Sequence, residues 1–158
     1  MHITSNLNLL VLILLIHLPV NGQVKSKSAI IDPTGSYKLN NKTVTKNGET
    51  YGYFGHVEVK LLQYSKIAIN LYVCKGATSY NSGGFLDTLT YQNNTATYTT
   101  TEYDSTCRII LTFKKTGITI EQYQANLNNG CGFGHGVFAD GYYRKISSKV
   151  PVITDEQD

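Results

Sequence analysis

The residues in this sequence that are best suited to chemistry are few and widely spaced. Two of the four histidines lie within residues 1–22, which leaves His56 and His135 for the folded part. Two histidines cannot supply a three-histidine metal site, and the H-E-x-x-H and C-x-x-C spacings are absent. The G-x-S-x-G pattern of a serine nucleophile is also missing around Ser82. The sequence therefore predicts a protein that has no metal site, needs no cofactor and is not an enzyme. A hydrolase is the alternative, and it requires His135 within hydrogen-bond reach of an acid in an open cleft.

Two segments rich in glycine are better candidates for binding than for catalysis. The first covers residues 76–85 and reads GATSYNSGGF, with small hydroxyl and amide side chains around one tyrosine. Its glycines permit positive φ and a close approach of the backbone to a partner, and this mixture of side chains is typical of recognition loops. An ordinary turn between strands uses the same residue types and stays the alternative. The candidate binding residues are Ser79, Tyr80, Asn81, Ser82 and Phe85.

The second segment, residues 130–143, reads GCGFGHGVFADGYY and has five glycines within twelve positions. It is not a phosphate loop, because neither a Lys-Ser/Thr pair nor a helix start follows. In a structural role, the glycines let the chain cross the end of a barrel, and Asp140-Gly141 turns it into a last strand. In a binding role, Phe133, His135 and Asp140 form a contact surface on which the imidazole titrates near neutral pH.

The N-terminal residues predict export from the cytoplasm. Residues 7–20 form an apolar run that is short for a membrane span but has the size of a signal-peptide core. Small or modest residues at 20–22 predict cleavage before Gln23 and removal of residues 1–22 as a signal peptide. An uncleaved anchor is the alternative, because no Lys or Arg precedes the run. We expect a secreted or periplasmic protein whose mature chain has no membrane span.

An oxidising compartment makes the three cysteines candidates for a disulfide bond. Cys107 alternates in phase with Ile109 and with the later apolar positions of the same strand, which places it on the core face. Cys74 is out of phase with the apolar positions of its own strand and points away from the core. We therefore favour a bond between Cys107 and Cys131 with Cys74 free, although sequence alone does not fix the connectivity.

The elements that position these segments are expected to be short strands. Turn signals recur about every 8 to 12 residues, which is typical of an all-β sandwich or barrel. Asn47-Gly48 is the strongest hairpin signal. We expect one all-β domain over residues 32–146, an antiparallel meander of eight or nine strands closed into a small calycin-like or lipocalin-like barrel, with residues 147–158 as a flexible tail. The segments with a strand pattern, from which these eight or nine strands are expected, are 36–39, 43–46, 50–54, 56–62, 66–74, 85–91, 95–101, 106–114, 118–123 and 141–146.

Composition and charge narrow the possible functions. Apolar residues make up 41% and charged residues 16% of the chain, which argues against disorder and against a coiled coil. The formal net charge of +3 comes from lysines scattered along the chain rather than gathered in one basic stretch. Dispersed charge of this size favours solubility, and no aromatic-basic pattern accompanies it, so nucleic acid is not expected as a partner.

Two motifs resemble known groups of proteins. CGFGHGVFADGYYRK (residues 131–145) and KGATSYNSGGFLDTL (residues 75–89) resemble small exported bacterial proteins that consist of a single β-domain without an established activity. Residues 82–85 are also similar to the hydroxyl-rich Ser-Gly-x-x-Tyr segment of periplasmic lysozyme inhibitors of the small antiparallel barrel type, with Phe85 in place of the tyrosine. That second resemblance implies insertion of this segment into the cleft of a lysozyme.

Taken together, these patterns predict an exported, non-catalytic binding protein. Its contacts are expected from the 79–85 loop and the 133–143 end. The partner is another exported protein, such as a lysozyme, or a small apolar ligand inside the barrel, for which eight or more strands leave room. A purely structural component of the cell envelope is the remaining alternative.

Overall fold

A computed structural model describes residues 29–63 and 65–153. The expected signal peptide, residues 1–22, lies outside the described residues, as do residues 154–158 of the expected tail. Within the described ranges all regular structure is β-strand, which confirms the all-β prediction. This part of the chain contains no helix with the length and hydropathy needed to cross a membrane.

Nine strands are found among the described residues. Asn47 and Gly48 both adopt positive φ, at 51° and 81°, and form the tight hairpin turn that their sequence predicts. The strands are β1 (Gly35–Leu39), β2 (Val44–Lys46), β3 (Glu49–Leu61), β4 (Lys66–Gly76), β5 (Ser82–Gln92), β6 (Thr95–Thr99), β7 (Arg108–Lys114), β8 (Gly117–Tyr123) and β9 (Gly141–Ser147).

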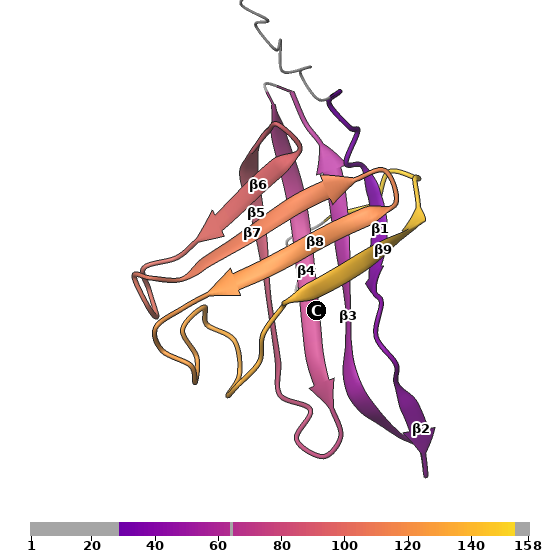
Figure 1. Ribbon diagram of the computed structural model, residues 1–158, viewed down its shortest axis with the longest axis vertical. Helices are drawn as coiled ribbons and strands as arrows, with labels where there is room; N and C mark the ends of the chain where they lie inside the picture. Colours follow the sequence, from indigo (N-terminus) through magenta and orange to yellow (C-terminus); the bar gives the residue numbers. More distant parts are fainter. Residues whose placement is uncertain (1–28, 64, 154–158) are drawn as a thin grey trace, which may run out of the picture.

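Eight of these strands close an antiparallel barrel (Figure 1). Their order is β1-β9-β8-β7-β6-β5-β4-β3, and pairing of β1 with β3 completes the ring. β2 pairs only with β3 and extends from the ring as a hairpin arm. The predicted antiparallel barrel is therefore confirmed. Closure leaves the first and last strands of the ring paired on both sides, which removes sheet edges that would otherwise invite aggregation.

One expected break in the strand pattern does not exist. The sequence predicts separate strands at 50–54 and 56–62, but β3 is continuous through Gly55, because its pairing with β4 runs without interruption from Phe54 opposite Cys74 to Leu61 opposite Ile67. A side chain at Gly55 would collide with the backbone of Tyr72 on β4. Glycine is used here for close approach of two strands and not for a turn.

Alternate residues of the strands fill the barrel with apolar side chains. The rings of Tyr91 and Tyr37 each meet the ring of Phe113 edge to face, with centroids 5.3 and 6.4 Å apart. Each fully buried aliphatic side chain contributes about 1.5–3 kcal/mol to folding. The buried core residues include Val57, Val59, Ile67, Ile69, Leu71, Val73, Leu89, Ala96, Ile109, Leu111, Ile118, Ile120 and Tyr143.

β5 and β6 pair only next to the turn that joins them. Their ladder consists of Tyr91 opposite Ala96 and Gln92 opposite Thr95, and beyond it the two strands diverge (Figure 1). Farther along, the ring of Phe85 on β5 stacks on the ring of Tyr98 on β6, with centroids 3.9 Å apart. The aromatic stack takes the place of backbone pairing and holds the two strands together.

The chain continues past β9 along the outside of the barrel. β9 ends at Ser147, the first residue of the expected tail, and residues 148–153 follow without regular structure. Ile153 is half-buried and lines a surface hollow together with Ala68 on β4 and Leu86 on β5. This part of the tail is therefore placed against the outer surface of two strands.

Candidate functional site

A disulfide bond ties the start of β7 to the long connection between β8 and β9. Cys107 and Cys131 are bonded, with Cα atoms 5.3 Å apart and a separation of 24 positions in sequence, as the alternation of apolar residues predicts. Cys74 is free, which agrees with that prediction, but it is buried. It lies outside the barrel core and is covered by the connection between β4 and β5, where its Sγ–H donates to the carbonyl of Tyr80 at 3.5 Å.

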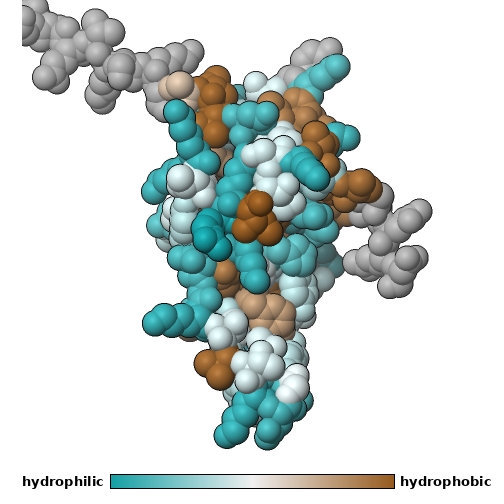
Figure 2. Space-filling view, turned by 90° about the vertical axis from the view of Figure 1, so that its right-hand side faces the viewer, coloured by the Kyte–Doolittle hydropathy of each residue, from teal (hydrophilic) through white to brown (hydrophobic). Residues whose placement is uncertain are grey.

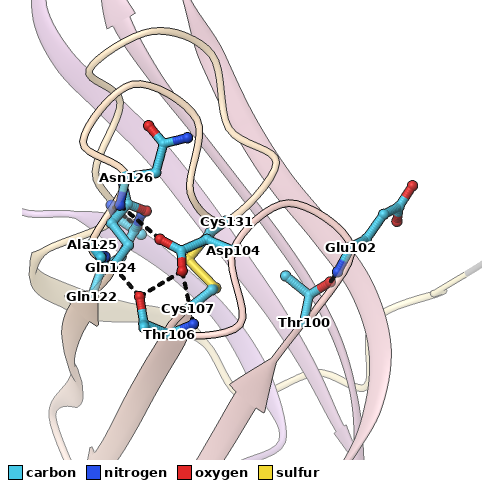
Figure 3. Close-up of a disulfide and its surroundings, with 11 residues drawn as sticks. Thr100, Glu102, Asp104, Thr106, Cys107, Gln122, Gln124, Ala125, Asn126 and Cys131 are labelled. Atoms are coloured by element: carbon cyan, nitrogen blue, oxygen red, sulfur yellow. Dashed lines mark hydrogen bonds between the residues drawn. A yellow bond between two sulfur atoms is a disulfide. The ribbon is translucent and has the colours of Figure 1, made fainter.

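Beside the disulfide, the carboxylate of Asp104 joins the same two loops (Figure 3). It accepts hydrogen bonds from the N–H of Asn126 at 2.7 Å and from the N–H and Oγ1 of Thr106 at 2.8 and 2.6 Å. Thr106 Oγ1 in turn accepts from the N–H of Ala125 at 2.7 Å. These bonds favour the ionised form, and they lower the pKa of Asp104 to about 2, with the Asn126 bond as the largest cause.

The two segments that the sequence singles out meet each other in the structure. The N–H of Gly134 donates to the carbonyl of Ser82 at 2.8 Å, and the side-chain amide of Asn81 donates to the carbonyl of His135 at 3.2 Å. The ring of Phe133 lies directly over Gly83, where an added Cβ would overlap it. The 130–143 segment is therefore fixed on one side by the disulfide and on the other by the beginning of β5.

Exposed side chains gather on the loops that are joined in this way. A shallow hollow of about 470 Å³ is lined by Tyr103, Asn128, Asn129, Phe133 and His135 together with Gly132 and Gly134. The ring of Tyr103 is 52% exposed and lies against Gly132, whose φ is +77°. We call Asn81, Tyr103, Asn128, Asn129 and His135 the braced face.

Three of these five residues were missed by reasoning from the sequence. Tyr103, Asn128 and Asn129 lie outside both glycine-rich segments, and they reach the hollow through the disulfide and the Asp104 bonds. The signal that points to them is their position near the two bonded cysteines. Tyr103 comes four residues before Cys107, and Asn128 and Asn129 come just before Cys131.

Three predicted binding residues, Ser82, Phe85 and Phe133, lie in a strand or in packed positions. The prediction of a loop through residues 79–85 is wrong from Ser82 onward, where β5 begins. Phe85 stacks on Tyr98, and Phe133 is 1% exposed within the core. Their aromatic side chains are used for packing because the glycines around them leave volume that a ring can fill.

The remaining candidates of the first segment lie at the tip of the β4–β5 connection. Ser79 is exposed, and its Oγ accepts from the N–H of Asn81 at 3.4 Å. The hydroxyl of Tyr80 donates to a carboxylate oxygen of Glu49 and accepts from the N–H of Thr50. The bond to Glu49 raises the pKa of Tyr80. Tyr80 therefore anchors this connection to the beginning of β3.

Asp140 belongs to a different part of the surface. Its Oδ1 accepts from the N–H of Gln122 at 3.0 Å. It lines a second hollow, of about 350 Å³, with Tyr53, Phe138 and Tyr142. Residues 133–143, expected to form one contact surface, therefore lie in two places. His135 is on the braced face, and Asp140 is beside the β2–β3 arm.

The braced face combines aromatic, amide and imidazole groups. Among the residues described, no three His, Cys, Asp or Glu side chains gather as a metal site would require. Within the same ranges the imidazole of His135 forms no hydrogen bond to an acid. What the face offers is one aromatic surface, three amides and one imidazole, all accessible from outside.

Comparison of the chain with protein-family models, with curated proteins and with solved structures found no match. No activity or partner of a relative is therefore transferred to this chain. The geometry of the braced face carries the functional proposal.

Proposed function

We propose that the protein is an exported binding protein without catalytic activity, and that it recognises another exported protein through the braced face. The observation that carries this proposal is that two separate segments, residues 79–82 and 130–136, join into one exposed surface. Hydrogen bonds, the Phe133 ring and the disulfide bond hold them there. A disulfide-bonded barrel also fits an oxidising compartment.

The rigidity of this surface supports a role in binding. Loops that must be ordered on association lose conformational entropy, at a cost of about 0.5–1.5 kcal/mol for each long side chain that is immobilised. Here the loop backbones are already fixed by the Cys107–Cys131 bond and by Asp104. A partner therefore meets a surface whose shape exists before contact.

The side chains of the braced face also have polar groups and exposed surface that are available to a partner. Within the described part of the chain, the imidazole of His135 and the side-chain amide of Asn128 form no hydrogen bonds. Tyr103 presents half of its surface to solvent. Tyrosine and asparagine in this combination provide an apolar contact area with adaptable hydrogen bonds.

The two other binding modes have less support from the geometry. A small apolar ligand needs space inside the barrel, but the rings of Tyr37, Tyr91 and Phe113 meet one another there. Insertion of residues 82–85 into a lysozyme cleft needs a projecting loop, but these residues begin β5 and Phe85 stacks on Tyr98. A lysozyme that contacts the braced face instead is one member of the proposed partner class.

The proposal is tested by capture of partners from the extracytoplasmic fraction of the source cells. The immobilised oxidised protein is compared with Tyr103→Ala/His135→Ala, which removes two groups of the braced face. The matched control is Tyr51→Ala/His56→Ala, which removes the same residue types from exposed positions on β3. We expect a protein that is retained by the native chain and the control but lost from the braced-face variant. Retention by all three, or by none, would contradict the proposal.

A further inference from the structure

A basic hollow lies at the other end of β8 from the braced face. β8 ends at Tyr123, next to the loops of the braced face, and begins at Gly117, beside the turn at Lys115 (Figure 1). Here a hollow of about 450 Å³ is lined by Lys115, Thr116, Arg144, Lys145, Ile146, Ser147 and Ser148. Three cationic side chains and three hydroxyl groups line it, and no carboxylate does.

Two cationic side chains face each other across the sheet beside this hollow. Lys38 on β1 is the direct cross-strand partner of Arg144 on β9, and like charges at opposite positions destabilise a sheet. Among the residues described, Lys38 and Arg144 form no ion pair, whereas the ammonium group of Lys145 lies over the ring of Tyr37, 5.5 Å from its centroid. The pKa of Asp32 is lowered mainly by hydrogen bonds from Thr34 and in smaller part by Lys145.

One exposed aliphatic side chain lines the basic hollow, and others follow in the segment after β9. Ile146 lines it and is 56% exposed, and it shares the outer face of β9 with Arg144. Val150 and Val152 follow in the same segment with 63% and 83% of their surface exposed. Figure 2 shows apolar residues gathered in the upper part of this side of the molecule, next to hydrophilic ones.

We propose that this end of the barrel docks on a membrane surface that contains anionic phospholipid. Arg144 is suited to a phosphate group because its planar guanidinium donates two parallel hydrogen bonds, and Lys115 adds a point charge. Ile146 and Val150 enter the boundary between headgroups and acyl chains, as apolar residues beside basic ones do in proteins that lie on membranes. The braced face, at the far end of β8, then points away from the membrane.

The test is sedimentation of the oxidised protein with vesicles of phosphatidylglycerol and phosphatidylcholine, compared with vesicles of phosphatidylcholine alone. We expect binding to the anionic vesicles only, weakened by added salt. Lys115→Glu/Arg144→Glu should reduce the partition coefficient more than about tenfold. The charge-matched control Lys42→Glu/Lys46→Glu, on the β2 arm and in the loop before it, should reduce it much less.

The contribution of the aliphatic side chains to membrane binding and the source of the phosphate group are tested in separate experiments. Ile146→Ser/Val150→Ser should also weaken binding, whereas Val44→Ser/Leu127→Ser, at similarly exposed positions elsewhere, should not. Circular dichroism confirms that each variant is folded. The proposal is overturned by equal binding to both kinds of vesicle, by no binding, or by equal losses in variants and controls. It is also overturned if millimolar inorganic phosphate occupies the site and the vesicles do not. None of these outcomes depends on the braced face.

Discussion

The ring of Phe133 occupies the space in which a side chain at Gly83 would lie. This contact joins the beginning of β5 to the long β8–β9 connection, and a backbone hydrogen bond from Gly134 to Ser82 accompanies it. Glycine at position 83 is therefore required by packing. Its lack of a side chain lets a fully buried aromatic ring fix the loop that carries His135.

Gly83→Ala is expected to destabilise the protein by about 1–3 kcal/mol, because the added methyl group forces the Phe133 ring out of its site. Urea denaturation measures the change. In a double-mutant cycle, Phe133→Leu should cost less in the Gly83→Ala background than in the native one, since the smaller side chain makes room. Simple additivity of the two changes would show that the contact is absent.

Cys131→Ser is expected to lower the free energy of unfolding by about 3 kcal/mol, because loss of the bond frees a long loop in the unfolded chain. Thermal unfolding under oxidising conditions measures the effect, and the reduced native protein should behave like the variant. Thiol titration of the denatured protein should find one group before reduction and three after it. Three groups before reduction would contradict the assigned bond.

The hydrogen bonds to Asp104 predict a loss of stability in acid. Its pKa is about 2 in the folded protein and near 3.8 when the chain is unfolded. The stabilisation is therefore complete above about pH 4 and disappears as the pH falls toward 2, where the folded protein takes up the proton. Asp104→Asn should be less stable at pH 7, and the difference from the native protein should shrink over this range. A difference that does not change with pH would contradict the assigned role.

The stacking of Phe85 on Tyr98 predicts that Phe85 is needed for the fold itself. Phe85→Ala is expected to cost about 2 kcal/mol, because the half-buried ring bridges two strands that lack backbone pairing at this point. The neighbouring Leu86→Ala is the control, since Leu86 is exposed on the other face of β5 and should change stability little. Equal effects of the two substitutions would argue against the bridge.

The barrel could be predicted from its regularly spaced turn signals, and the disulfide bond from period-two alternation. Cys107 keeps the phase of Ile109 on β7, and Asn47-Gly48 permits only a tight turn. The beginning of β5 could not be found in this way. Gly83 and Gly84 have no side chains, so they give no alternation signal, and residues suited to a loop are in fact paired with β4.

Contacts across the fold explain the other differences. Cys74 is out of phase with the core, as alternation predicts, but the connection between β4 and β5 folds back and buries it. Tyr103 and Asn128 reach the braced face only because the disulfide and Asp104 bring two distant loops together. Such contacts depend on tertiary structure, and no local pattern encodes them.

The most direct test of the proposed binding role places a photo-crosslinking amino acid at position 135 and, in a second protein, at position 56. Both positions carry an exposed histidine, one on the braced face and one on the outside of β3. After irradiation of the source cells, we expect a discrete adduct with another exported protein from position 135 and none from position 56. The absence of an adduct at position 135, or the same adducts from both positions, would contradict recognition through the braced face.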